Sequence, residues 1–327
     1  MVAPRLAIVI HAEEEFDWSG SFRRSNKDVT HGNELTLLID KMLNLDAKVT
    51  LAMDYPFVIS DEGREVIEHF KHLISSNIEF AAHLHPWVNP PFETENDVVD
   101  NFYSYPGNLA PEFELKKLKV LAQEIEKVTG CQPTTYLAGR YGIGINSNQV
   151  LESLGFKTDL SISSYCDFSH QGGPDFTSYT NEVHVSDDIL HFPHTGSIIT
   201  AIPYVSDYFN RNPAMFTSWQ SSKVKQLLSK LLRIRRYRLS PEGFDFRHMK
   251  ALTRQQIAIG QKEFIFSFHS PSAKPGCTPY VNSDVDLKRF EMNITKYIKW
   301  FRCELNGEYI LPNEQLKYME NNQSDYL

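Results

Sequence analysis

The sequence of 327 residues has only four cysteines, Cys131, Cys166, Cys277 and Cys303, and no two of them stand close together. This scattering argues against a cysteine zinc site or a disulfide framework and suits a reducing compartment. No stretch approaches the roughly 18 consecutive apolar residues of a transmembrane helix. The apolar run LAIVI near the N-terminus is also too short for the core of a signal peptide. We therefore expect a soluble, cytoplasmic protein without a transmembrane segment.

The chain also lacks an excess of positive charge. It contains 33 Lys and Arg against 41 Asp and Glu, a formal net charge of −8, so no basic field attracts nucleic acid. With 41% hydrophobic and 23% charged residues the composition is globular, which excludes a disordered chain, a coiled coil or a fibre. The 12 histidines are more informative, because their positions can be compared with predicted strand ends.

Short β-like runs alternate with segments of helical period along most of the chain. The runs RLAIVIH, KVTLAM and IEFAAHLH are each followed by an expected helix, beginning near Asn33, at an N-cap Ser60 and near Pro111. Repeated strand–helix units predict a parallel sheet or barrel whose reactive loops follow the strands. We expect an α/β fold, a distorted (β/α) barrel that forms one domain over residues 1–327.

The alternation lapses between about Tyr165 and Lys262, which we interpret as an irregular, partly helical insertion. Within it we expect a helix over residues 227–232 that runs into the arginine-rich segment RIRRYR. A solvated basic face is the main interpretation of these arginines, and contact with a phosphate-bearing substrate is the alternative. The regular pattern resumes with the buried strand KEFIFSFHS and a helix from about Ser283 to Leu305.

Histidines stand at the ends of three expected strands. His11 and Glu13 alternate after the first, His83 and His85 alternate on the third, and His269 ends the late strand. Alternate residues of a strand share a face, and parallel strands of a barrel end at one cleft, so these side chains should converge. Two imidazoles and a carboxylate suit Zn²⁺ with a fourth position open for water, which makes Glu13, His83 and His85 candidate ligands. Histidines satisfied within the core are the alternative.

Four segments, in this order and at these separations, carry a resemblance to a known family: HAEEEFDW, AAHLHPWVNPPF, LAGRYGIG and FSFHSPSAKPGCTPYV. They resemble the polysaccharide deacetylase family with the NodB homology domain (carbohydrate esterase 4-like), in particular the WalW-like branch of exopolysaccharide and capsule gene clusters. The resemblance covers about residues 5 to 305. It implies a distorted (β/α) barrel and metal-dependent removal of N-acetyl, less often O-acetyl, groups from sugars.

The resemblance also assigns roles by position. His11 falls at the general base, Glu13 at a carboxylate ligand and His83 at the first histidine ligand. Arg140 matches the arginine that orients the base, and His269 matches the histidine acid.

Two positions depart from the family pattern. The base is usually aspartate, whereas an imidazole at His11 can accept a proton, add a metal ligand or mark altered activity. Trp87 occupies the slot of the second histidine ligand, so His85, on the same face as His83, is the nearest replacement.

Three aromatic residues, Trp87, Phe92 and Tyr141, are expected to line a sugar site. The partner would be an acetylated sugar, a nucleotide-sugar or a lipid-linked saccharide. Glu14 and Glu15 are expected on the surface, as is His31, and His194 could approach the cleft without a motif to support a role.

The sequence is also consistent with other functions. An amidohydrolase-type enzyme would carry its His-x-His pair on the first strand, whereas here the pair is on the third. A metal-independent hydrolase of the same fold and a catalytically inactive saccharide-binding homologue also fit the departures at His11 and Trp87.

Overall fold

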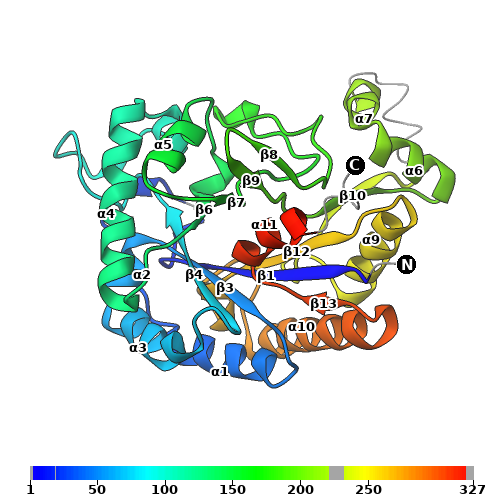
Figure 1. Cartoon of the computed structure of the whole chain (residues 1–327), viewed down its shortest axis with the longest axis horizontal. Helices are drawn as coiled ribbons and strands as arrows, with labels where there is room; N and C mark the ends of the chain where they lie inside the picture. The colour runs from blue at the N-terminus through cyan, green and yellow to red at the C-terminus, as the bar shows by residue number, and fades with distance from the viewer. Residues whose placement is uncertain (1–2, 19, 221–231, 322–327) are drawn as a thin grey trace.

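The computed structural model describes residues 3–18, 20–220 and 232–321. In these residues a curled, nine-stranded sheet crosses the molecule in the order β12-β1-β3-β4-β6-β7-β9-β8, and β13 pairs with β1 (Figure 1). Its strands are β1 (Arg5–Ala12), β3 (Val49–Met53), β4 (Ile78–Leu84), β6 (Thr135–Ala138), β7 (Thr158–Asp159), β8 (His184–Ser186), β9 (Ile189–His191), β12 (Glu263–His269) and β13 (Glu308–Tyr309). All paired neighbours run parallel except β8 and β9, which confirms the predicted α/β architecture.

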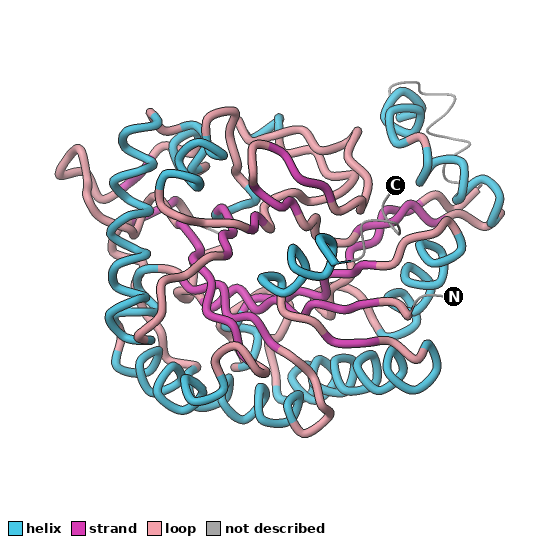
Figure 2. Tube along the Cα trace, viewed as in Figure 1, coloured by secondary structure: helices cyan, strands magenta, loops and turns pink. Residues whose placement is uncertain are grey.

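Helices surround the strands (Figure 2). They are α1 (Gly32–Leu43), α2 (Tyr55–Ile59), α3 (Asp61–Phe70), α4 (Pro111–Thr129), α5 (Ser147–Ser153), α6 (Pro203–Arg211), α7 (Pro213–Gln220), α9 (Phe246–Ala258), α10 (Asp284–Leu305) and α11 (Pro312–Asn321). The predicted N-cap Ser60 accepts a hydrogen bond from the backbone N–H of Gly63, and Gly130 ends α4 with a left-handed φ of 78°. No helix of the described residues has the length and apolar character needed to cross a bilayer.

The remaining elements are short. They are the antiparallel pairs β2 (Phe22–Arg23) with β5 (Val98–Val99) and β10 (Gly196–Ile199) with β11 (Arg235–Arg238), and the 3₁₀ helices η1 (Lys71–Leu73), η2 (Phe102–Ser104), η3 (Pro106–Asn108), η4 (Gly139–Tyr141), η5 (Ser169–Gln171) and η6 (Ser270–Ala273).

Alternate residues of the buried strands face two different hydrophobic cores. Along β1, Ile8 and Ile10 pack in the larger core between the sheet and the helices, whereas Val9 faces the inside of the curl. His11 and Glu13 continue the inner series at the end of the strand, because side chains alternate across a sheet. Side chains of α11 pack against the inner core. The alternation therefore sends polar groups to one end of the inner space.

The region from about 165 to 262 contains more regular structure than the sequence indicates. Within it, β9 extends the main sheet beside β7, and α9 packs against β10 and β11. The segment RIRRYR does not continue a helix, because Arg235–Arg238 pair with β10 as a strand, and this tertiary pairing overrides the helical propensity of arginine. The helix expected over residues 227–232 lies, apart from Leu232, outside the described residues.

One buried carboxyl group in β4, that of Glu79, makes the stability of the fold depend on pH. Burial raises the pKa of Glu79 to about 7, and hydrogen bonds from Thr135 and Thr50 only partly oppose this. A carboxyl group whose pKa rises on folding stabilises the fold fully below its unfolded pKa of 4.5. That contribution is lost as the pH rises through the folded value of about 7.

We therefore expect the substitution Glu79→Gln to remove a pH dependence of stability. Relative to this variant, the wild-type free energy of unfolding should fall by up to about 3 kcal/mol between pH 4.5 and pH 8, measured by urea denaturation. The exposed Glu65→Gln variant should follow the wild type. A constant difference between wild type and Glu79→Gln across this range would contradict the assignment.

Candidate active site

A cleft of about 480 Å³ opens where β1, β4, β6 and β12 end. Eight of the nine residues that the sequence singles out line it, namely His11, Glu13, His83, His85, Trp87, Arg140, Tyr141 and His269. The ninth, Phe92, lies outside the lining. The Arg24 guanidinium and the Lys117 ammonium lie 4.4 and 4.9 Å from its ring centre, so the prediction that Phe92 contacts the sugar is corrected.

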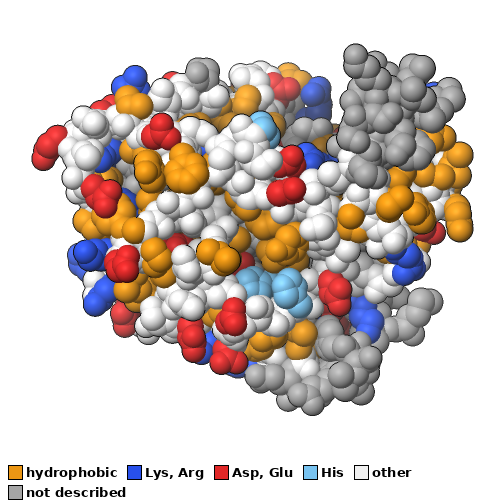
Figure 3. All heavy atoms as spheres, turned by 90° about the horizontal axis from the view of Figure 1, so that it is seen from above, with side chains coloured by type: hydrophobic (Ala, Val, Ile, Leu, Met, Phe, Trp, Pro, Cys, Tyr) orange, Lys and Arg blue, Asp and Glu red, His pale blue; other side chains and the backbone are white. Residues whose placement is uncertain are grey.

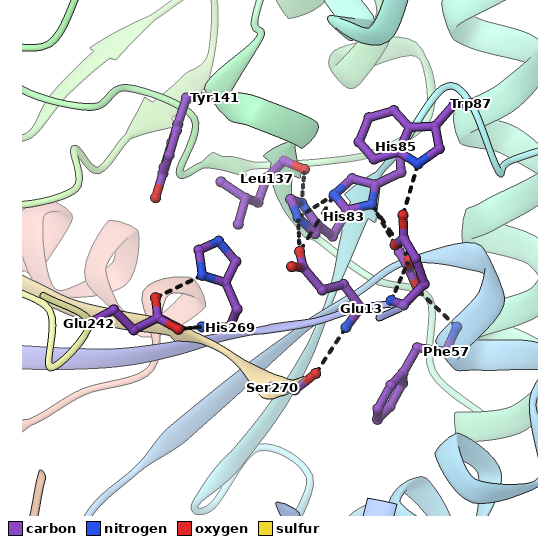
Figure 4. Close-up of polar contacts among 12 residues, drawn as sticks. Glu13, Phe57, His83, His85, Trp87, Leu137, Tyr141, Glu242, His269 and Ser270 are labelled. Carbon is purple, nitrogen blue, oxygen red and sulfur yellow. Dashed lines mark hydrogen bonds and ion pairs between the residues drawn. The ribbon is translucent and has the colours of Figure 1, made fainter. Parts of the chain in front are cut away.

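The side chains of Glu13, His83 and His85 point toward one another (Figure 4). Nε2 of His83 lies 2.9 Å from Nε2 of His85 and 3.3 Å from Oε2 of Glu13, and the third distance, from His85 Nε2 to Glu13 Oε2, is 3.6 Å. All three side chains are buried. Three polar atoms from two strands therefore share one enclosed point.

The hydrogen bonds of the two Nδ1 atoms fix the tautomers of His83 and His85. Nδ1 of His83 is 2.9 Å from the carbonyl oxygen of Leu137, and Nδ1 of His85 is 2.8 Å from Oε2 of Glu14. A carbonyl oxygen only accepts hydrogen bonds, so Nδ1 of His83 carries the proton, and the carboxylate favours the same tautomer in His85. Burial lowers the pKa of both imidazoles, so the inward Nε2 atoms carry lone pairs.

Glu13 completes the set as a carboxylate. Burial alone would raise its pKa, but the charge of His269 and the contact with His83 bring the pKa below its ordinary value. Three acceptor atoms without a donor between them attract a cation. Zinc bonds of about 2.0–2.1 Å in a tetrahedron place ligand atoms roughly 3.3 Å apart, which matches the observed separations. Glu13, His83 and His85 therefore fit a divalent metal. Two groups that overlap with this set also have possible ligand atoms within 4.8 Å of one another, namely His11 with Glu13 and His83, and His85 with Glu14 and Asp54.

Behind this set lies a second buried cluster. Glu14 is fully buried and not on the surface as the sequence predicts, because it accepts a hydrogen bond from Nε1 of Trp87 at 2.8 Å and contacts His85. Burial raises the pKa of Glu14 to about 7, and burial together with Glu14 raises the pKa of Asp54 well above its usual range. The ring of Trp87 stacks on His85 with centres 4.2 Å apart and is 2% exposed. Trp87 thus supports His85 and shows little surface to a sugar.

We expect Glu14→Gln to weaken zinc binding by about 10- to 100-fold, because the carboxylate fixes the tautomer and orientation of a ligand histidine. Competition with a chelating dye measures the affinity, and circular dichroism checks the fold. The exposed Glu152→Gln variant serves as the matched control and should bind as the wild type does. An unchanged affinity in folded Glu14→Gln would contradict this role.

A hydrogen-bonded chain holds the backbone at Glu13. Ser270 Oγ accepts from the N–H of Glu13 at 3.1 Å and lies 2.8 Å from Nε2 of His31, whose Nδ1 lies 3.1 Å from Glu15. His31 is fully buried and Glu15 is half-buried, so the surface positions predicted for both are corrected. The contacts join η6, the start of α1 and the end of β1, which no sequence pattern reveals.

His269 is paired with Glu242, a residue that the sequence analysis missed. Oε2 of Glu242 lies 2.7 Å from Nδ1 of His269, and Oε1 accepts the backbone N–H of His269 at 3.1 Å (Figure 4). Burial opposes the charge on His269, but the carboxylates of Glu242 and Glu13 outweigh it and raise its pKa to about 9. His269 is therefore an imidazolium at neutral pH, with Nε2–H free to donate.

The substitution Glu242→Gln should return the pKa of His269 from about 9 toward its ordinary 6.5, because it removes the nearest negative charge. Titration of the ring proton by NMR in metal-free protein measures this change. The exposed Glu182→Gln variant should leave the titration unchanged. If His269 still titrates near 9 in Glu242→Gln, another group holds its proton.

His11 lines the cleft and packs against three other histidines. Its ring centre is 4.8 Å from that of His269, 5.1 Å from that of His83 and 5.5 Å from that of His194. Burial, followed by the charges of His269 and His83, lowers the pKa of His11 well below its ordinary value. Nε2 of His11 is buried and has no hydrogen-bond partner among the described residues, so a neutral imidazole with an unused nitrogen lines the site.

Arg140 lines the cleft, but its hydrogen bonds do not go to His11. Its guanidinium donates to Oδ1 of Asn101 at 2.9 Å, to Ser104 Oγ at 2.5 Å and to Gln171. The backbone of Arg140 has a left-handed φ of 56°. The predicted function of orienting the base is therefore corrected, and Arg140 ties the loops of the cleft wall together.

His194 packs beside His11 and Tyr141 but is not among the described residues that line the cleft. Its Nδ1 lies 2.9 Å from Ser267 Oγ, and its ring centre is 5.0 Å from that of Tyr141. The side chain is buried and follows β9, so it enters the inner face of the sheet where the first-strand residues already point. In the sequence, the position of His194 after an expected strand is the one sign that it lies near the cleft.

The curled parallel sheet, with its polar groups gathered at one end, has the fold of the NodB-like polysaccharide deacetylases. One solved structure with this fold is a probable polysaccharide deacetylase from Pseudomonas aeruginosa PAO1. It has a TM-score of 0.54 and 11% identity, over 97% of this chain and 91% of that chain. The likeness confirms the distorted (β/α) barrel that the sequence resemblance implies.

Two other solved structures share the architecture. PuuE allantoinase has a TM-score of 0.53 and 10% identity, over 97% of this chain and 90% of that chain. A 4-alpha-glucanotransferase from Thermococcus litoralis has a TM-score of 0.52 and 10% identity, over 97% of this chain but 40% of that one. No family model and no curated protein matches the sequence. At these identities the likeness concerns the fold.

Proposed function

We propose that this protein is a metal-assisted hydrolase that removes an acetyl group from the nitrogen of an amino sugar, with an O-acetyl group as the alternative. The observation that carries the proposal is the convergence of Glu13 Oε2, His83 Nε2 and His85 Nε2 within 3.6 Å of one another. The deacetylase fold supports the choice of reaction.

In the proposed reaction His11 accepts one proton and His269 donates another. A bound Zn²⁺ would polarise the acetyl carbonyl and lower the pKa of a water molecule toward about 7. His11, neutral and with an unused Nε2, accepts the proton of the attacking water. His269 donates a proton from Nε2 to the departing amine, because Glu242 keeps it protonated.

The cleft has the size and lining of a sugar site. Its volume of about 480 Å³ lies within the range of roughly 300–1,000 Å³ that is usual for small-molecule pockets. Trp18, Tyr141 and Tyr280 contribute to its walls, and aromatic side chains offer large apolar surfaces that can pack on a sugar ring. We propose an acetylated sugar as the substrate, whether a free sugar, a nucleotide-sugar or a lipid-linked saccharide.

Release of acetate from N-acetylated sugars tests the proposal. We expect activity that a chelator removes and zinc restores, and His269→Ala should lower kcat by about 10²- to 10⁴-fold because the leaving amine loses its acid. The exposed His72→Ala variant is the matched control and should retain full activity.

Other outcomes would replace the proposal. Activity that survives complete removal of metal would favour a metal-independent hydrolase of this fold. Hydrolysis of allantoin in place of sugars would favour the second class of C–N hydrolase that has this architecture. Binding of acetylated sugars without acetate release under any metal condition would establish a saccharide-binding homologue.

A further inference from the structure

Arg238 brings a positive charge from β11 into the cleft. Its Nη2 donates to the hydroxyl of Tyr141, and its Cζ lies 4.8 Å from the centre of that ring. Among the described residues, no carboxylate oxygen lies within 4.0 Å of this guanidinium. An arginine has five N–H donors, and the hydroxyl of Tyr141 is the side-chain acceptor that the described residues offer to Arg238.

A side pocket of about 280 Å³ adjoins Arg238. It shares five lining residues with the main cleft, namely His11, Tyr141, Arg238, His269 and Tyr280. Ser240 and Phe244 also line it. Arg238 lines both spaces, so a substituent on a molecule bound in the cleft can reach its guanidinium.

The carboxylates near this pocket already have partners. Glu242 accepts hydrogen bonds from the backbone N–H of His269 and from Ser272, and its other oxygen contacts His269 Nδ1. Glu13 belongs to the acceptor set described above. Glu242 acts on Arg238 only through its field, because its direct contacts go to His269 and Ser272.

The other arginines of RIRRYR do not face the cleft. Arg235 is exposed, and Arg236 donates to the carbonyl oxygen of Tyr165 at 2.7 Å. Acidic and basic side chains are scattered over the face seen in Figure 3, with no single basic patch. The positive charge at Arg238 is therefore a local feature of a protein whose formal net charge is −8.

We propose that Arg238 binds an anionic group, a carboxylate or a phosphate, on the acetylated sugar that this cleft takes. The inference rests on the proposed function and narrows its substrate class. Guanidinium suits such groups because its planar pair of N–H donors matches two oxygen atoms. The hydroxyl of Tyr141 holds the guanidinium from one side and leaves its other N–H groups to the ligand.

Binding and activity with matched sugars test this inference. The probes are N-acetylglucosamine, its 6-phosphate, its 1-phosphate and N-acetylmuramic acid, which carries a carboxylate. Calorimetry on metal-free protein measures binding, and acetate release with zinc measures kcat and KM. The variants are Arg238→Gln, Arg238→Lys and the exposed control Arg235→Gln.

We expect the wild type to bind at least one charged sugar about 10- to 100-fold more tightly than N-acetylglucosamine. Arg238→Gln should remove this preference and leave the affinity for the neutral sugar within twofold, Arg238→Lys should restore part of it, and Arg235→Gln should behave as the wild type. The probe that depends on Arg238 identifies a carboxylate or a phosphate as the group.

Three results would overturn the inference: equal binding of neutral and charged sugars by the wild type, no binding of any charged sugar, or an equal loss for both kinds in Arg238→Gln. The first result together with acetate release would leave the proposed function standing. Conversely, binding of a charged sugar that depends on Arg238, without acetate release, would refute the deacetylase and retain the anion site.

Discussion

Three acceptor atoms, from Glu13, His83 and His85, face one another in a buried space, and the electrostatics of the site follow from this arrangement. Without a positive charge between them, their lone pairs repel in surroundings that screen charge poorly. The fold holds them there because β1 and β4 lie on either side of β3 in one parallel sheet, in a register that puts Ala12 and Ala82, which precede Glu13 and His83, at the same level. A cation at this point would convert the repulsion into attraction.

The surrounding shell fixes each of these atoms separately. The carbonyl of Leu137 and the carboxylate of Glu14 orient the two imidazoles, and Ser270 holds the backbone of Glu13. These three supporting groups come from three different parts of the chain, so the site depends on several strand ends and their loops. Glu242 supports His269 in the same way, because it orients the imidazole ring and raises the pKa of His269.

The region that the sequence shows as an insertion also contributes to the site. It supplies Arg238 and Glu242, one from a short antiparallel ladder and one from the loop that follows it. In the proposed chemistry the ends of the parallel strands provide the metal ligands and the residues that transfer protons. The region from about 165 to 262 provides the charged side chains Arg238 and Glu242. A deacetylase, an allantoinase and a glucanotransferase share this fold, and proteins of one fold can differ in substrate through such loops.

The sequence by itself determined the parallel α/β architecture and the residues that meet at the strand ends. Alternation along a strand is a local property, so His11, Glu13 and His83 could be assigned to one face before their neighbours were known. It could not determine the position of Glu14, because β1 ends at Ala12 and the chain then follows contacts with Asp54 and Trp87. Only the tertiary structure brought Glu242 to His269 and placed Arg238 in the cleft. Neither follows a periodic pattern, and β11 forms only because β10, distant in sequence, offers it hydrogen bonds.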